Sequence, residues 1–266
     1  MRDTFGKIGE TSGSVLAGLG RLSGLLGQIC TLLIKAPFQR KTISMRHVYH
    51  QIVLMGVDSF AIICLVGASV GMVLALQASY QLKQFGAELY TGSLVSVSVT
   101  RELGPLVAAI VLSGRVGARL AAELGTMKVQ EEVDALSTMG LNPVQYLVLP
   151  RFLAFMIILP CLTVVADVMG MVGGFLISTL ALAMNPYLYI AKTFDALVLK
   201  DIYTGLIKSG LFAVLIALVS CHQGLSVEGG ADGVGQATTS AVVVSIVLIL
   251  LMDCLSTAVM YYVLPS

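Results

Sequence analysis

The sequence predicts an all-α polytopic membrane protein. Hydrophobic residues make up 57% of its 266 positions and charged residues only 12%, and the mean hydropathy is +0.92. A soluble domain carries about 25% charged residues. The apolar positions gather in runs of the ~20 residues that a helix needs to cross the hydrocarbon core of a bilayer. We therefore expect five transmembrane helices, an N-terminal helix at the membrane interface, and a short cytoplasmic helix between spans two and three.

The N-terminal helix is predicted over residues 15–34. Its apolar positions follow steps of four and three residues, which places them on one helix face. They are Val15, Leu19, Leu22, Leu26, Ile29 and Leu33. The stretch 22–34 is too short to cross ~30 Å of hydrocarbon, so we place this helix in the membrane interface. A helix partly buried against the bundle is the alternative. We divide the chain into an N-terminal segment, 1–49, and a transmembrane domain, 50–266, and we predict no cleavable signal peptide.

Span one is predicted over about 50–79, and it is uncharged except for Asp58. Gly67 and Gly71 stand four residues apart on it. Small residues at this spacing let two helices approach closely within a membrane. Span one is therefore expected to pack tightly against another span. Span two is predicted over about 93–114, after a short polar loop.

Two adjacent charges, Arg101 and Glu102, lie inside the apolar sequence of span two. A charged side chain at the bilayer centre costs from ~2.5 kcal/mol upward, so such residues usually face a cavity or a charged partner. Pro105 follows, and because proline has no N–H to donate, it should kink or unwind the helix near Arg101. The pair either faces a cavity or ties span two to Asp58, to Asp167 or to another span.

Residues 115–142 are polar and helical in composition, and Gly140 is a favourable end point for a helix. Near the end of this segment an apolar stripe with i, i+3, i+6 spacing lies beside an acidic flank. The stripe is Val133, Leu136 and Met139, and the flank is Glu131, Glu132 and Asp134. A short helix of this kind can dock in a groove of another subunit. An ordinary solvated helix is the alternative.

The next apolar run, 144–184, is interrupted only by Arg151 and Asp167. At 1.5 Å per residue this run would extend roughly 60 Å as a helix, too long for one span. We assign one span near 152–180, with 144–151 as an interfacial lead-in. Two re-entrant halves are the alternative.

The last third of the chain contains two further spans, predicted over about 205–225 and 238–260. Residues 185–204 are amphipathic and predict a short surface helix, and a glycine-rich turn is expected at 228–235. Lys and Arg residues set the orientation. With the N-terminus inside, eleven lie in inner segments and four in outer segments, which fits the positive-inside rule. The N-terminus is thus predicted to be cytoplasmic and the C-terminus to be on the outer side.

Several short motifs in one order resemble the signature of the MlaE family, the permease subunits of lipid-transporting ABC systems. They are Thr100–Pro105 (TRELGP), Gly114–Gly117 (GRVG), Ala122–Lys128 (AELGTMK), Glu132–Leu136 (EVDAL), Met139–Pro143 (MGLNP) and Leu149–Arg151 (LPR). The resemblance extends from the N-terminal helix to the end of the chain. No single motif is specific, but their joint order and spacing are.

The resemblance implies a phospholipid transporter of the bacterial inner membrane that works as a homodimer. It further implies a cytoplasmic ABC ATPase dimer that holds ATP and Mg, a small STAS-type protein, and a periplasmic ring of MCE-domain proteins. Phospholipid would move between the inner and outer membranes. The family pattern places a lipid cavity at the start of span two and an ATPase-coupling segment after it. The cavity residues would be Arg101, Glu102, Leu103, Tyr80 and Gln77. The coupling residues would be Glu131, Glu132, Val133, Asp134, Leu136 and Met139.

Two rival functions are considered beside this one. Asp58, Asp167 and Asp253 are intramembrane carboxylates of the kind that relay protons in an ion-coupled secondary transporter. A non-transporting membrane scaffold for a periplasmic partner is the second rival. The sequence has no G-x-x-x-x-G-K-[ST] phosphate-binding loop, so ATP hydrolysis is expected in a partner and not in this chain. His47 and His50 have no third ligand nearby, so no metal is predicted, and the net charge of +1 gives no reason to expect a nucleic-acid partner.

Overall fold

The computed structural model describes residues 20, 24–25, 27–29, 31–32 and 45–263, and it contains no β-strand in these residues. Within them, five helices are long and apolar enough to cross a membrane, as the sequence predicts.

Span one is α2 (Met45–Gln84). Span two is a composite of η1 (Glu88–Tyr90), α3 (Thr91–Ser98), η2 (Val99–Leu103), α4 (Gly104–Leu112), η3 (Ser113–Gly117) and α5 (Ala118–Val129). The short helix α6 (Glu132–Thr138) follows, and then span three, η4 (Val144–Val148) with α7 (Leu149–Leu180). The surface helix α8 (Pro186–Ala196) leads to span four, α9 (Leu199–Leu225), and span five, α10 (Gly230–Val263).

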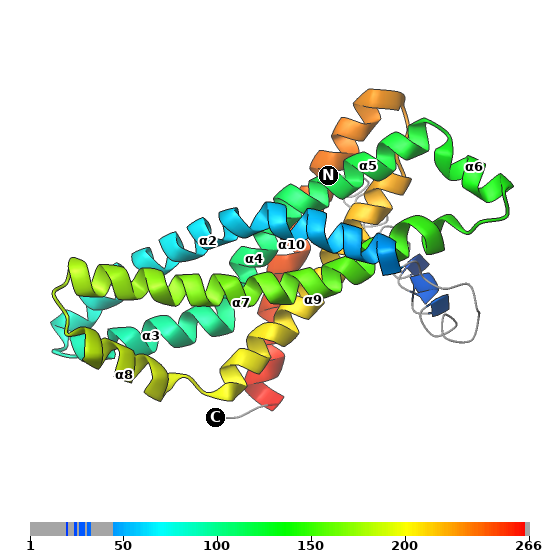
Figure 1. Ribbon diagram of the computed structural model, residues 1–266. Helices are drawn as coiled ribbons and strands as arrows, with labels where there is room; N and C mark the ends of the chain where they lie inside the picture. Colours follow the sequence, from blue (N-terminus) through cyan, green and yellow to red (C-terminus); the bar gives the residue numbers. More distant parts are fainter. Residues whose placement is uncertain (1–19, 21–23, 26, 30, 33–44, 264–266) are drawn as a thin grey trace, which may run out of the picture.

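The helices form two groups that meet along α7 and α9. α2 packs along α7, and α10 packs along α9 and α5. In Figure 1, α6 lies at one end of the bundle, and α8 lies beside α3 at the opposite end. The two polar connections, one before and one after span three, are therefore on opposite sides of the transmembrane bundle.

A seam of glycines joins spans one and three, as the spacing of Gly67 and Gly71 predicts. Both glycines are buried. A Cβ on Gly71 would overlap the backbone carbonyl of Gly170, and a Cβ on Gly173 would overlap that of Ala68. Only glycine permits two backbones to approach this closely. The resulting van der Waals packing stabilises the helix pair, because helices in lipid have no hydrophobic driving force to associate. We call Gly67, Gly71, Gly170 and Gly173 the glycine seam.

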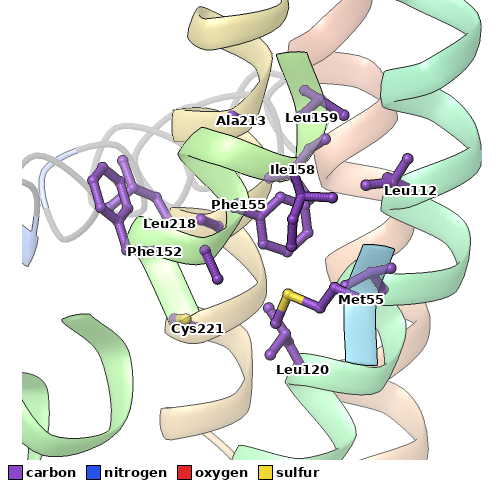
Figure 2. Close-up of a cluster of buried hydrophobic side chains, with 14 of the residues drawn as sticks. Met55, Leu112, Leu120, Phe152, Phe155, Ile158, Leu159, Ala213, Leu218 and Cys221 are labelled. Carbon is purple, nitrogen blue, oxygen red and sulfur yellow. The ribbon is translucent and has the colours of Figure 1, made fainter. Parts of the chain in front are cut away.

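The main hydrophobic core lies where spans two, three and four meet. Phe155 of α7, Leu112 of α4 and Ile216 of α9 are fully buried there. Figure 2 shows Phe155 next to Ile158, with side chains of span two facing them from the other side. Gly117, in η3, packs against Ile216 and Ser220 of α9. Gly114 has open space around it, so of these two glycines only Gly117 packs tightly against another helix.

The segment 115–142 was predicted to be helical, and η3, α5 and α6 lie within it. Helix runs from the predicted span two without a break through η3 and α5 to Val129, because the polar residues there remain good helix formers outside the apolar run. Two other predicted boundaries were wrong. Span four begins at Leu199, so 185–204 is not one surface helix: α8 ends at Ala196 and the next span starts three residues later. The glycine-rich turn is also shorter than 228–235, because α10 already begins at Gly230.

Span three contains one continuous helix, α7, that begins before the predicted boundary at 152 and includes Pro160. The alternative of two re-entrant halves is therefore wrong. Its lead-in, η4, is a π-helical turn. After span three, Asn185 starts α8: its side-chain oxygen accepts the N–H of Tyr187 at 3.0 Å, and Pro186 occupies the first turn, where its missing N–H costs nothing.

Part of the predicted N-terminal helix, 15–34, lies outside the described residues. The described positions among 24–32 are helical. Ile29 is fully buried in the main core, and Leu25 and Leu32 pack against that core. These positions thus contact the bundle, and the placement of the helix at the membrane interface stays a prediction.

Candidate functional site

The candidate site is centred on a π-helical turn in span two. In η2 (Val99–Leu103) the hydrogen-bond register widens, and the N–H of Gly104 donates to the carbonyl oxygen of Val99, five residues earlier. Pro105 explains this change, since it has no N–H with which to continue a regular α-helical ladder. The distortion predicted near Arg101 thus takes the form of a π turn, a feature that is frequent at functional sites. This turn carries Arg101 and Glu102.

Arg101 is anchored to the start of span four. Its Nε donates to Oδ1 of Asp201 at 2.5 Å. Asp201 is 2% exposed, and its other oxygen accepts the backbone N–H of Val198 at 3.4 Å, which caps the first turn of α9. The side chain of Arg101 itself is 46% exposed. The guanidinium is therefore fixed on one side and accessible on the other.

Glu102 belongs to a second ionic contact, built around Lys208 of α9. Lys208 is 1% exposed, and its ammonium donates to the carboxylate of Glu102, to Oδ1 of Asp253 at 3.0 Å and to Oγ1 of Thr257 at 2.7 Å. These contacts use all three donors of a lysine ammonium. We call Arg101, Glu102, Asp201, Lys208 and Asp253 the charged cluster; it joins spans two, four and five.

Both members of the Arg–Glu pair therefore have partners in other spans, but neither partner is Asp58 or Asp167. Asp201 and Lys208 are site residues that the sequence analysis missed. It assigned Asp201 to the surface helix 185–204, and it counted Lys208 as one of the four outer basic residues although Lys208 lies within the predicted span four. A signal was present in their spacing: seven residues apart, they lie on the same face of one helix. Asp253 was singled out, but as part of a proton relay and not as a partner of Lys208.

Of the other predicted cavity residues, Leu103 directly follows Glu102 on η2, whereas Gln77 and Tyr80 lie on span one. Leu103 is half-buried on η2, and Gln77 and Tyr80 are exposed on α2, with Tyr80 73% exposed. Within the described part of the chain, no hydrogen bond or ion pair connects Gln77 or Tyr80 to the charged cluster. That these residues line one cavity with Arg101 stays a prediction.

The predicted coupling residues lie on and around α6, where the apolar stripe is divided. Val133 is 7% exposed and Leu136 packs against the main core, whereas Met139 is 74% exposed. Gly140, at φ 75°, ends the helix, and Leu141 donates to the carbonyl of Leu136 at 3.0 Å, a C-terminal capping pattern that favours glycine. The inner part of the stripe holds α6 onto its own chain, and only the outer part is free to contact another subunit.

The acidic flank of α6 is exposed. Asp134 receives the ammonium of Lys128 at 2.9 Å, which ties α6 back to α5. Glu131 adopts a left-handed conformation, φ 61°, in the tight turn between the two helices. Glu131 and Glu132 have no ion pair within the described residues and are available to a partner.

A chain of ion pairs runs from α5 to spans one and three. Arg119 contacts Glu123 at 2.8 Å and Asp58 of α2 at 3.6 Å, and Glu123 contacts Arg151 of α7 at 3.4 Å. Asp58 is thereby assigned to this end of the bundle. Movement of α5 and α6 would be transmitted to spans one and three through these contacts.

Nothing in the described residues forms a metal centre: no three His, Cys, Asp or Glu side chains come together there. His47 instead packs edge-on against Tyr146, with ring centroids 5.8 Å apart. This contact fixes the start of α2 against η4.

Comparison with known proteins assigns the chain. The family model described as Permease MlaE matches residues 48–259. The chain belongs to the MlaE permease family. It is 42% identical over 216 residues to a protein of Rickettsia typhi named a probable ABC transporter permease protein, covering 81% of this chain and 83% of that one. It is 39% identical over 225 residues to a probable ABC transporter permease protein of Synechocystis, covering 85% and 84% of the two chains.

A chloroplast MlaE relative is the protein TRIGALACTOSYLDIACYLGLYCEROL 1 of Arabidopsis thaliana, 34% identical over 229 residues, which cover 86% of this chain and 64% of that protein. The MlaE chain described here is thus a multi-pass membrane protein and a permease of the ABC transporter class. That class implies dimerisation and a partner ATPase in which ATP and Mg act.

Proposed function

We propose that this chain is the permease subunit of an ATP-driven phospholipid transporter, which moves lipid between the inner and outer membranes of a bacterium and maintains outer-membrane lipid asymmetry. The observation that carries the proposal is Arg101, a charged side chain in a transmembrane helix that is 46% exposed although it is ion-paired. Membership of the MlaE family supports the assignment. The name of the Arabidopsis relative contains a glycerolipid, which favours lipid as the substrate class.

The chemistry of Arg101 suits a phospholipid headgroup. Asp201 engages the Nε of the guanidinium and fixes its direction. The two terminal amino groups make no hydrogen bond within the described residues, and a guanidinium edge of this kind binds a phosphate through two parallel N–H donors. A phosphodiester at membrane depth would find a donor pair already oriented. Glu102, 38% exposed in its side chain, would lie beside it and could accept from an amine-bearing headgroup.

The cavity that receives the lipid would form between two copies of the chain. Only 17% of the most hydrophobic window of α10 is buried within one chain, against 28% to 56% for the other spans. A second copy covering α10 would enclose the charged cluster, because Asp253 and Thr257 lie on that helix. Arg101, Glu102 and Leu103 would then face the space between the copies, and Gln77 and Tyr80 would lie on its outer rim.

The ATPase would dock at α6 on the cytoplasmic side. Met139, Glu131 and Glu132 provide an exposed apolar and acidic surface there. Rearrangement of the ATPase would reach the spans through α5 and its ion pairs to Asp58 and Arg151. With α6 inside, the N-terminus is cytoplasmic and the C-terminus periplasmic. A STAS-type protein on the ATPase side and a ring of MCE-domain proteins over α8 would complete the system.

A reconstituted complex tests the proposal. The chain is purified with its ATPase in phosphatidylethanolamine–phosphatidylglycerol vesicles, and ATP-dependent transfer of a labelled phospholipid is measured for wild type, Arg101→Lys and Arg101→Ala. We expect transfer to require ATP and to fall at least about ten-fold in both variants, because lysine cannot bind Asp201 and a phosphate as a planar fork. Half-buried Lys192 of α8, which lies outside the charged cluster, is replaced by methionine as the control. Transfer that proceeds without ATP and stops when a proton gradient is collapsed would support an ion-coupled transporter instead.

A further inference from the structure

Asp167, in the middle of α7, has a buried carboxyl group. It is 8% exposed, and its Oδ1 has no hydrogen-bond partner among the described residues. No ion pair reaches it within the described residues, since Arg101 is engaged by Asp201 and Lys208 by Glu102 and Asp253. An ionised carboxylate that is buried without a cation is strongly unfavourable, and a membrane interior makes this worse. The group is therefore expected to be uncharged, and a neutral carboxylic acid has one O–H to donate.

The side chain of Asp167 is aimed at the π turn that carries Arg101 and Glu102. Its Oδ1 occupies the position where a Cβ would stand on Gly104, directly after η2, and the carbonyl oxygen of Val99 lies 3.1 Å from the same position. One turn further along α7, Gly170 packs against the side chain of Val99. Span three thus touches η2 at two places: the Asp167 carboxyl group lies beside Gly104, and the Gly170 backbone packs on the Val99 side chain.

The π turn also needs external support. In a π turn each carbonyl accepts the N–H five residues later. The carbonyl of Thr100 would therefore need the N–H of residue 105, but that residue is a proline and has none. Thr100 is 2% exposed, so water does not replace that donor. Gly205 of α9 approaches the Thr100 carbonyl so closely that a side chain there would overlap it. The turn therefore packs between α7 and α9, and the carbonyl of Thr100 lacks its hydrogen bond within the turn.

We propose that Asp167 is a positioning residue: its carboxyl group, in the neutral form, donates a hydrogen bond to the backbone carbonyl oxygen of Val99 and holds η2 in the π geometry that presents Arg101 and Glu102. Asp167 touches neither substrate nor nucleotide and acts only through the turn. The importance of this geometry for transport rests on the proposed lipid function. This positioning role differs from the proton relay for which Asp167 was considered in the sequence analysis.

Two substitutions distinguish a neutral donor from an ionised group. Asp167→Asn keeps the shape and an N–H donor but cannot ionise, and Asp167→Leu keeps similar bulk without a donor. In the vesicle assay described above, we expect Asp167→Asn to retain transfer within about two-fold and Asp167→Leu to lose about five-fold or more, the ratio that one net hydrogen bond is worth. Thr163→Val is the matched control: Thr163 is also buried, one turn away, and among the described residues it donates only to the Leu159 carbonyl of its own helix.

A double variant distinguishes the loss of the hydrogen-bond donor from the loss of the volume that the Asp167 side chain fills. Gly104→Ala places a methyl group where Oδ1 now lies, so the double variant Gly104→Ala/Asp167→Ala refills that space without a donor. We expect the double variant to remain impaired. Restoration of transfer by the double variant, equal loss in Asp167→Asn and Asp167→Leu, or wild-type transfer in Asp167→Leu would each overturn the proposal. If wild-type vesicles show no ATP-dependent transfer, the proposed function fails instead; the stability of the purified Asp167 variants, ranked in the same order by thermal unfolding, then tests the hydrogen bond alone.

Discussion

Replacing Lys208 by methionine should destabilise the protein more than any other single loss of a lysine that we can identify in its described part. Methionine has nearly the same length as lysine and keeps the packing, so the change removes the charge and little else. Glu102 and Asp253, which lie on different spans, would be left facing each other without the ammonium that separates them. The two carboxylates would then repel each other or one would have to take up a proton, and either outcome weakens the contact between spans two, four and five.

The size of the effect follows from burial. Removing one partner of a buried ion pair costs about 3–5 kcal/mol. Glu102 is 38% exposed in its side chain, whereas Lys208 is 2% and Asp253 is 18% exposed, so solvent screening places the expected cost near the lower end, about 3 kcal/mol. A chain of this size loses about 2–4 °C of melting temperature per kcal/mol. We therefore expect the midpoint of thermal unfolding to fall by about 6–12 °C.

Thermal unfolding of the detergent-purified complex, followed by size-exclusion chromatography after heating, measures this shift. Lys128→Met is the matched control, since it removes an exposed ion pair with Asp134, and such pairs contribute only about 0–1 kcal/mol. Adding Glu102→Gln to Lys208→Met should recover part of the loss, because it removes one of the two unpaired carboxylates. A fall of less than about 2 °C for Lys208→Met, or a fall equal to that of Lys128→Met, would refute the reasoning.

Three further predictions concern other parts of the chain. Gly71→Val should prevent spans one and three from closing at Gly170 and abolish recovery of monodisperse protein, whereas Gly56→Ala, which has open space, should leave the yield unchanged; equal yields would contradict the glycine seam. Met139→Asp should release the ATPase in a pull-down while the melting temperature stays within about 2 °C, and retention at wild-type stoichiometry would count against docking at α6. Asn185→Ala should cost about 1 kcal/mol and lower the melting temperature by about 2–4 °C through loss of the α8 cap; an unchanged melting curve would show that the cap contributes nothing.

The fold could be predicted from the sequence largely because a membrane imposes simple rules. Runs of apolar residues identify helices that cross the bilayer, and the spacing of Gly67 and Gly71 predicted that span one packs tightly against another span, which the structure shows to be span three. Hydropathy cannot locate a helix end where a polar segment is also helical. This is why helix was predicted after residue 114 but not its unbroken continuation of span two to Val129, and why Leu199 was not recognised as the start of span four.

The candidate site was only half predicted. The cost of intramembrane charge singled out Arg101 and Glu102, and Pro105 indicated a distorted helix beside them. Their partners, Asp201 and Lys208, lie 100 and 106 residues away, and no periodicity in a single sequence reports a contact between separate helices. The same limit applies to α6: its apolar stripe was recognised, but the spacing does not say that Val133 faces its own chain while Met139 faces outward.

The large sequence separations within the charged cluster also bear on how the chain is made. Synthesis proceeds from the N-terminus at about 5–20 residues per second, so span two would enter the membrane several seconds before Asp201 and Lys208 exist. During that interval Arg101 and Glu102 have no counter-charges. Asp253, a partner of Lys208, is synthesised 45 residues later still. A truncated chain that ends before span five would keep an incomplete set of charges inside the bilayer. The charged cluster is therefore complete only once span five has been synthesised and inserted.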